Sequence, residues 1–148
     1  MTDRQMAVFD IDGVLADASH RQHFVESRPK DWDAFFAAVG EDPVIEAGRA
    51  RVIEVSDEHE VVVVSGRPER TRAATEAWLE AAGMGRPRVI LRPDHDRRPA
   101  ADLKAELLTG LAAPGDIWVV VDDDITVVER VTALGYRAEL FLADNPLA

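Results

Sequence analysis

Two aspartates follow a short apolar run and stand two residues apart, in the order Phe9-Asp10-Ile11-Asp12-Gly13. A strand that ends here would deliver both carboxylates to its tip, and the glycine would let the chain turn sharply after them. Carboxylates at a strand end can bind Mg²⁺, and one of them can act as a nucleophile toward phosphorus. A calcium-binding loop begins in the same way, but Leu15 and Arg21 stand where an EF-hand requires glycine and a bidentate glutamate. A turn of capping carboxylates without a function is the remaining alternative.

Three further groups could complete a site around a phosphate. The apolar run 61–64 leads into Ser65-Gly66-Arg67, whose hydroxyl and amides could cradle an anion where a strand passes into a helix. The run 117–121 leads into Asp122-Asp123-Asp124, and a divalent cation would offset the repulsion among these carboxylates. Lys104 lies on a predicted helix between them. Taken singly, these features also fit a common Ser-Gly turn, a surface ion pair of Arg67, a solvated acidic turn and a solvated lysine.

Apolar runs and helical patterns alternate along the chain, which predicts a parallel sheet with helices on both faces. The expected strands are residues 6–9, 61–64, 89–91, 117–121 and 137–142, and the expected helices are about 44–57, 69–82, 99–112 and 125–134. A parallel sheet gathers the carboxyl ends of its strands at one edge, so the acidic, serine and lysine groups are expected to meet there. The fold class is therefore α/β, a three-layer Rossmann-like domain over 1–148 with a central five-stranded parallel sheet.

The stretch from about 14 to 43 interrupts this alternation and is expected to form a small helical insert after the first strand. Asp31 is a candidate cap for a short helix in it, and its aromatic residues are expected to fill core. The aromatic residues are Trp32, Phe35 and Phe36.

Composition excludes several classes of protein. The 148 residues carry 17 basic and 28 acidic side chains and a formal net charge of −11, which argues against passive coating of nucleic acid. The absence of cysteine excludes disulfides and thiolate metal sites. The apolar runs are too short to span a bilayer, and no signal-peptide pattern opens the chain, so we expect a cytoplasmic protein without membrane contact. The segment 86–104 is locally basic and could face an anion; its basic residues are Arg86, Arg88, Arg92, Arg97, Arg98 and Lys104.

The order Asp10-x-Asp12-Gly13, Ser65-Gly66-Arg67, Lys104 and Asp122-Asp123 resembles the four motifs of the haloacid dehalogenase (HAD) superfamily of phosphohydrolases. More narrowly, it is similar to the phosphatase domain of bacteriophage-type polynucleotide kinase–phosphatases, and Arg21 stands where that subgroup carries a substrate-binding arginine. These 148 residues contain no glycine-rich Gly-x-x-x-x-Gly-Lys loop, so we expect the kinase half of such enzymes to be absent from them. The chain departs from the subgroup at Ala100-Ala101-Asp102, where the relatives are more acidic.

The resemblance implies roles for these residues. Asp10 would be the nucleophile that forms a phosphoaspartate, and Asp12 the general acid and base. Ser65 and Lys104 would bind the phosphoryl oxygens. Arg67, Arg21 and Gly66 would contact the substrate. Mg²⁺ would be held by Asp10, Asp12 (through its backbone carbonyl), and Asp122 or Asp123.

The substrate stays open between nucleic-acid ends, such as a 3′-phosphate, or nucleotides on one side and small phosphorylated metabolites on the other. A non-catalytic receiver domain is a remote alternative, because receivers carry their lysine after the last strand rather than before the second acidic cluster. The sequence leaves the oligomeric state open between monomer and homodimer.

Overall fold

The computed structural model describes residues 4–143. Its sheet has the strand order β3-β2-β1-β4-β5, and every neighbouring pair is parallel. The strands are β1 (Met6–Phe9), β2 (Glu60–Pro68), β3 (Arg88–Arg92), β4 (Ile117–Asp122) and β5 (Ala138–Leu140). The five-stranded parallel sheet expected from the alternating pattern is confirmed.

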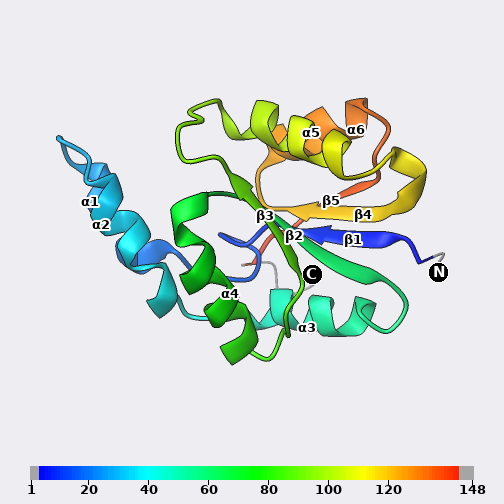
Figure 1. Cartoon of the computed structure of the whole chain (residues 1–148), viewed down its shortest axis with the longest axis horizontal. Helices are drawn as coiled ribbons and strands as arrows, with labels where there is room; N and C mark the ends of the chain where they lie inside the picture. Colours follow the sequence, from blue (N-terminus) through cyan, green and yellow to red (C-terminus); the bar gives the residue numbers. More distant parts are fainter. Residues whose placement is uncertain (1–3, 144–148) are drawn as a thin grey trace.

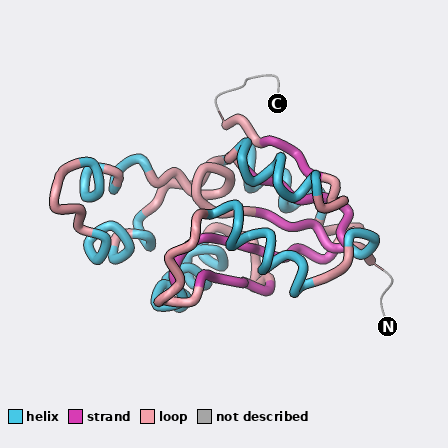
Figure 2. Tube along the Cα trace, turned by 90° about the horizontal axis from the view of Figure 1, so that it is seen from above, coloured by secondary structure: helices cyan, strands magenta, loops and turns pink. Residues whose placement is uncertain are grey.

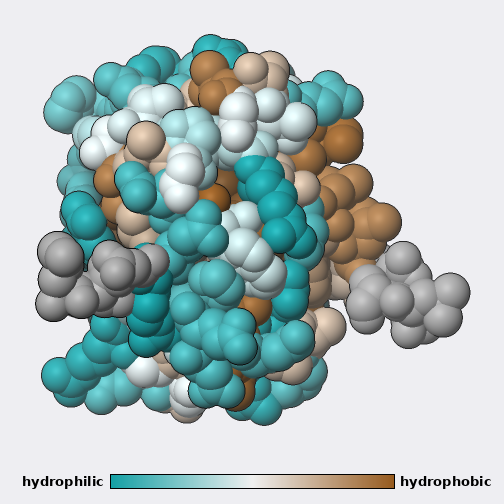
Figure 3. Space-filling model, turned by 90° about the vertical axis from the view of Figure 1, so that its right-hand side faces the viewer, coloured by the Kyte–Doolittle hydropathy of each residue, from teal (hydrophilic) through white to brown (hydrophobic). Residues whose placement is uncertain are grey.

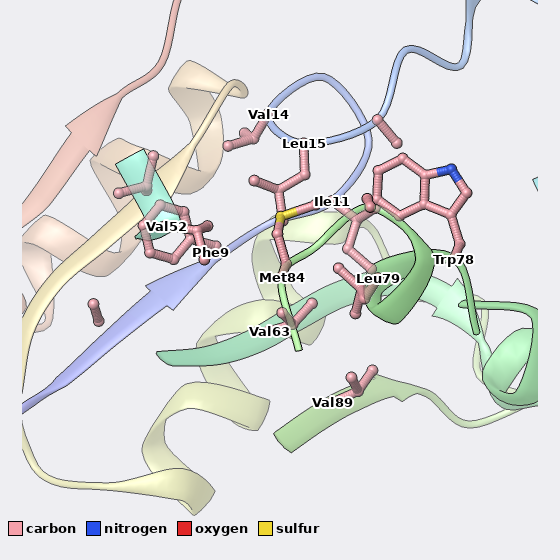
Figure 4. Close-up of a cluster of buried hydrophobic side chains, with 14 of the residues drawn as sticks. Phe9, Ile11, Val14, Leu15, Val52, Val63, Trp78, Leu79, Met84 and Val89 are labelled. Atoms are coloured by element: carbon pink, nitrogen blue, oxygen red, sulfur yellow. The ribbon is translucent and has the colours of Figure 1, made fainter. Parts of the chain in front are cut away.

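Helices cover both faces of the sheet, as Figure 1 shows. The helices on one face are α3 (Glu46–Val55) and α4 (Arg72–Ala81), and those on the other are α5 (Ala100–Leu111) and α6 (Ile125–Ala133). Alternate residues of β1 point to opposite layers: Phe9 joins the core under α3 and α4, and Val8 joins the core under α5 and α6. The first core includes Phe9, Leu79 and Met84 (Figure 4). Burial on both faces explains why the central strands read as continuous apolar runs.

The predicted boundaries differ from the observed ones mainly at the end of β2. This strand does not stop at residue 64 but continues to Pro68, with an irregular register between Val64 and Pro68. A short 3₁₀ helix, Glu69–Thr71, then precedes α4, so the Ser65-Gly66 pair does not lie directly at a helix start.

The segment between β1 and α3 forms the expected helical insert beyond the carboxyl ends of the strands (Figures 1 and 2). It contains α1 (His23–Glu26), α2 (Trp32–Ala37) and two 3₁₀ turns, Ser19–Arg21 and Val39–Glu41. The Asp31 side chain caps α2 by accepting from Ala34 N at 3.0 Å, as predicted. The expectation that the aromatic residues of α2 fill core is wrong: no residue of α2 is buried, and Trp32 is 46% exposed. A six-residue helix carried beyond the sheet edge has no apolar layer to pack against.

The opposite end of the molecule, at the amino ends of the strands, is largely hydrophilic (Figure 3). Arg88 begins β3 there, and Arg86 pairs with Glu80 at 3.0 Å, so neither arginine faces the edge where the acidic groups meet. Arg98 pairs with Asp96 and with Glu106. Arg86 and Arg88 therefore give no support to the idea that the basic segment faces an anion, whereas Arg92 donates from Nε to the carbonyl oxygen of Gly66, a residue that lines the cleft described below, at 3.0 Å. Among residues 4–143, no helix has the length and apolar character needed to cross a bilayer.

Candidate active site

Four of the predicted residues meet at the carboxyl edge of the sheet. Asp10 follows β1, Asp122 ends β4, and Asp123 begins the turn to α6. Carboxylate oxygens of these three residues all lie within 4.8 Å of one another. Lys104 of α5 reaches them from the other side, with Nζ 2.6 Å from Asp122 Oδ2 and 3.2 Å from Asp10 Oδ1.

The electrostatics of this cluster favour a bound cation. Burial raises the pKa of Asp10 well above its ordinary value; the Lys104 ammonium lowers this pKa in part, and the Asp122, Asp12 and Asp123 carboxylates raise it further. Burial and Asp122 likewise raise the pKa of Asp123. Burial alone would lower the pKa of Lys104, but Asp10 and Asp122 outweigh it and hold the ammonium in its charged form. One lysine thus faces more negative charge than it can balance.

Gly13 fixes the turn after the two catalytic candidates. Its φ is +86°, in the left-handed region, and its amide donates to Ala16 O at 2.9 Å. A Cβ at this position would collide with the carboxylate of Asp123. The turn therefore requires glycine for its backbone conformation and for the close approach of the acidic cluster.

The side chain of Asp12 turns away from the other carboxylates and lies against two buried arginines. Its Oδ1 accepts from Arg21 Nη2 at 2.9 Å and from Arg67 Nη2 at 2.7 Å and Nε at 3.2 Å. Its Oδ2 accepts one long bond of 3.4 Å, from Arg67 Nε. The side chains of Arg21 and Arg67 are both 0% exposed. Arg21 and Arg67, predicted as substrate contacts, thus hold Asp12 in place.

A buried carboxylate that sequence reasoning missed completes this network. Asp42 accepts from Arg21 Nε at 2.9 Å and Nη2 at 2.8 Å, and from Arg67 Nη2 at 3.0 Å. His20 Nε2 lies 2.6 Å from Asp42 Oδ1, the oxygen that also accepts from Arg21 Nε, and Thr75 Oγ1 accepts from Arg67 Nη1 at 3.0 Å. Asp42 lies in a Gly-Glu-Asp-Pro stretch that reads as a solvated turn, so its residue type gave no signal.

One donor in the network has no hydrogen-bond partner among residues 4–143. Arg21 Nη1 is buried and makes no hydrogen bond with the described residues. The guanidinium carbon of Arg21 lies 4.4 Å from the centroid of the Phe35 ring.

A cleft of about 270 Å³ brings the two halves of the site together. Ser65 and Gly66 line it from β2, and the Ser65 hydroxyl oxygen accepts from Arg67 N at 3.1 Å. Phe35 and Phe36 of α2 line it from the insert. The remaining lining residues are Asp10, Asp12, Arg67, Ala100, Lys104, Asp122, Asp123 and Asp124. Arg21 is not among them and reaches Asp12 from behind.

The donor set fits a hard divalent cation. Mg²⁺ prefers carboxylate oxygens, and three are offered here by Asp10, Asp122 and Asp123. A bound Mg²⁺ would offset the repulsion among these carboxylates, which contributes to the raised pKa of Asp10. The Asp12 side chain is not part of this oxygen cluster, so a contribution from Asp12 to the metal would come through its backbone carbonyl.

Solved structures of similar fold are HAD-type hydrolases and a nucleic-acid repair protein. The two Pnkp1/Rnl/Hen1 RNA repair complex structures each contain a chain that matches at a TM-score of 0.74 and 19% identity, over 95% of this chain and 43% or 47% of theirs. The class C acid phosphatase from Bacillus anthracis matches at 0.66 and 18%, over 99% of this chain and 69% of its own. A haloacid dehalogenase-like hydrolase from Xanthomonas campestris matches at 0.64 and 15%, over 97% and 88%. The fold is therefore that of the HAD-like hydrolases.

The family follows from the sequence as a whole. The model of the polynucleotide kinase PNKP phosphatase domain matches residues 4–139, and the chain belongs to this family of HAD phosphatases, which are phosphoric monoester hydrolases. The chain spans less than half the length of the Pnkp1 complex chains it matches. No curated protein matches it significantly.

Proposed function

We propose that this chain is a Mg²⁺-dependent phosphomonoesterase that acts through a phosphoaspartate and removes phosphate from nucleic-acid ends, such as 3′-phosphates, or from nucleotides. The observation that carries the proposal is the placement of Asp10 at the sheet edge, 3.2 Å from Lys104 and within the carboxylate cluster of Asp122 and Asp123.

Asp10 is the nucleophile. One of its carboxylate oxygens attacks phosphorus, the bond from phosphorus to the leaving oxygen breaks, and an acyl phosphate forms on Asp10. Lys104 and Ser65 bind phosphoryl oxygens during this step, and Gly66 lines the same cleft as a candidate substrate contact. Lys104 also balances part of the charge that Asp10 brings to the reaction.

Asp12 is the general acid and base. It gives its proton to the leaving oxygen and then takes one from the water that attacks phosphorus and releases inorganic phosphate. Arg21 and Arg67 saturate its Oδ1, so Oδ2, with a single long hydrogen bond, is the oxygen that carries the proton. The arginines thereby act as positioning residues. Arg67 also lines the cleft and can contact the substrate there, whereas Arg21, which does not line it, acts on the reaction through Asp12.

The metal would be held by Asp10, the backbone carbonyl of Asp12, and Asp122 or Asp123. When bound, Mg²⁺ supplies charge stabilisation to a phosphoryl group and offsets repulsion between that group and the carboxylates.

Two observations support a nucleic-acid end as substrate. The matching family model describes the phosphatase domain of a polynucleotide kinase, and one of the Pnkp1 structures of similar fold is that of an RNA repair complex. Small metabolites are the second candidate, because a cleft of about 270 Å³ admits a small phosphomonoester as readily as a nucleotide terminus. Cytoplasmic location and the oligomeric state stay predictions.

The experiment is a side-by-side comparison of kcat/KM for 3′-phosphorylated oligonucleotides, nucleoside monophosphates and sugar phosphates, with and without Mg²⁺. We expect Mg²⁺-dependent phosphate release that is fastest with the nucleotide substrates and falls to background in Asp10→Asn. Equal or faster release from sugar phosphates would reject the nucleotide preference, and turnover that persists in Asp10→Asn would reject the phosphoaspartate mechanism.

A further inference from the structure

Three aromatic side chains of α2 form an exposed surface at the mouth of the candidate site. Trp32 is 46% exposed, and Phe35 and Phe36 are partly exposed and line the cleft that contains Asp10 and Lys104. We call these three residues the aromatic surface. Exposed aromatic side chains that cluster next to a pocket indicate a binding surface, because soluble proteins usually bury such side chains in the core.

The rings of the aromatic surface are packed against one another. Trp32 and Phe36 are stacked, with centroids 5.8 Å apart and an interplanar angle of 21°. Phe35 meets Trp32 edge-on at 5.6 Å and Phe36 at 5.1 Å. Such mutual packing holds the rings against one another, and Trp32 still keeps 46% of its surface exposed to solvent.

A cation lies over each ring of the aromatic surface. The guanidinium of Arg21 lies 4.4 Å from the Phe35 centroid, and that of Arg70 lies 5.2 Å from the Phe36 centroid. Lys30 Nζ lies 5.6 Å from the Trp32 ring. The nearby acids are engaged: Asp31 caps α2, and Asp33 lies 3.6 Å from Arg70. Flat rings flanked by lysine and arginine suit a ligand that combines a planar base with phosphates.

We propose that the aromatic surface stacks on an unpaired nucleobase of the substrate while its phosphate occupies the cleft beside Asp10 and Lys104. This inference rests on the proposed function, and it adds a specificity determinant to it. A sugar phosphate offers no ring to the aromatic surface, whereas the terminal nucleotide of a single strand offers one directly.

A base at a blunt duplex end is already paired and stacked on its neighbour. Bringing it onto the aromatic surface requires unstacking, which costs a few kcal/mol. The aromatic surface therefore favours single-stranded or frayed ends over blunt ends. Equal rates on a single strand and on the same sequence in a blunt duplex would overturn this part of the inference.

The test compares two single-stranded 3′-phosphorylated oligonucleotides that differ only in whether the terminal nucleotide carries a base or is abasic. We expect kcat/KM to be about tenfold higher for the base-bearing substrate, from the usual strength of base–aromatic stacking. Trp32→Ala should remove this advantage through KM and leave the abasic substrate unchanged, and Trp32→Phe should retain most of it. The matched control is Ile53→Ala, which truncates a side chain 51% exposed on α3, outside the cleft.

The results separate the two proposals. Hydrolysis of both oligonucleotides with no preference for the base, or an equal loss on both in Trp32→Ala, overturns the stacking role and leaves the phosphatase function intact. If neither is hydrolysed, the proposed function fails, and binding still tests the aromatic surface. In Asp10→Asn, quenching of tryptophan fluorescence by the base-bearing oligonucleotide, weaker with the abasic one and lost in Trp32→Ala, would support stacking; its absence would refute it.

Discussion

The buried carboxylate of Asp42 offers the sharpest test of how the site is held together. Asp42→Ala removes a side chain that is 0% exposed and that accepts three hydrogen bonds from Arg21 and Arg67. Both guanidinium groups would then share Asp12 alone, whose side chain is 33% exposed. Removing one partner of a buried ion pair costs about 3–5 kcal/mol because the other charge stays buried and uncompensated.

We expect the lower end of that range, about 3 kcal/mol, because Asp12 still accepts from both arginines. For a chain of this length the corresponding fall in Tm is about 6–12 °C. The assay is urea and thermal unfolding of the metal-free protein followed by circular dichroism. The matched control is Glu46→Gln, which breaks an exposed pair with Arg49 at 2.6 Å and should cost less than about 0.5 kcal/mol.

The same substitution should also affect turnover. Without Asp42, the arginines lose the group that holds them against Asp12, so kcat should fall more than KM rises. Asp42→Asn, which keeps the shape of the side chain, provides the measurement if Asp42→Ala does not fold. A loss of stability no larger than that of Glu46→Gln, together with unchanged kcat, would refute the role assigned to the network.

Three further predictions concern the acidic cluster. Asp10→Asn should raise the Tm of the metal-free protein at pH 7: the pKa of Asp10 is raised in the folded state, so ionisation destabilises the fold, and the difference between the proteins should shrink as the pH falls through that raised pKa. A lower Tm for the variant in a pH series with chelator would contradict this. Lys104→Met should lower the Tm, because Asp10 and Asp122 lose the cation bonded to both, and Mg²⁺ should raise it more than in the wild type; an equal Mg²⁺ effect on both proteins would count against the cluster as the metal site. Gly13→Ala should cost about 1–2 kcal/mol from its left-handed φ and increase the Mg²⁺ concentration needed for activity by displacing Asp123. Unfolding curves and Mg²⁺ titrations check it, and an unchanged Mg²⁺ requirement would speak against the close approach.

The elements that pack on both sides were predictable from the sequence, and those that depend on distant partners were not. The strand Met6–Phe9 was predicted with its observed bounds, because continuous apolar residues leave few other ways to bury them. The end of β2 was not, since Ser-Gly usually marks a turn, whereas here the chain stays extended to Pro68, which pairs with Arg92. The cluster of Asp10, Lys104 and Asp122 followed from the rule that parallel strands end at one edge.

The missed features share one cause, which is that a residue's burial depends on contacts with residues far away in the sequence. Asp42 is buried because Arg21 and Arg67, 21 and 25 residues distant, converge on it. Trp32 is exposed because the insert carries α2 away from the sheet. The spacing of aromatic residues in the sequence does not by itself show whether they are buried or exposed.

Ion pairs between the insert and the α/β core limit how easily the insert can be exchanged for another. Arg21 and Asp42 belong to the insert, while Arg67 and Asp12 belong to the α/β core, and each arginine touches both carboxylates. An insert transplanted from another protein would leave Arg67 with half of its counter-charge and Asp12 with half of its support, unless it brought an equivalent arginine and aspartate. The insert that carries α2 therefore also supplies residues that hold Asp12. To change the substrate range, substitutions on the exposed face of α2 should be preferred to exchange of the whole insert.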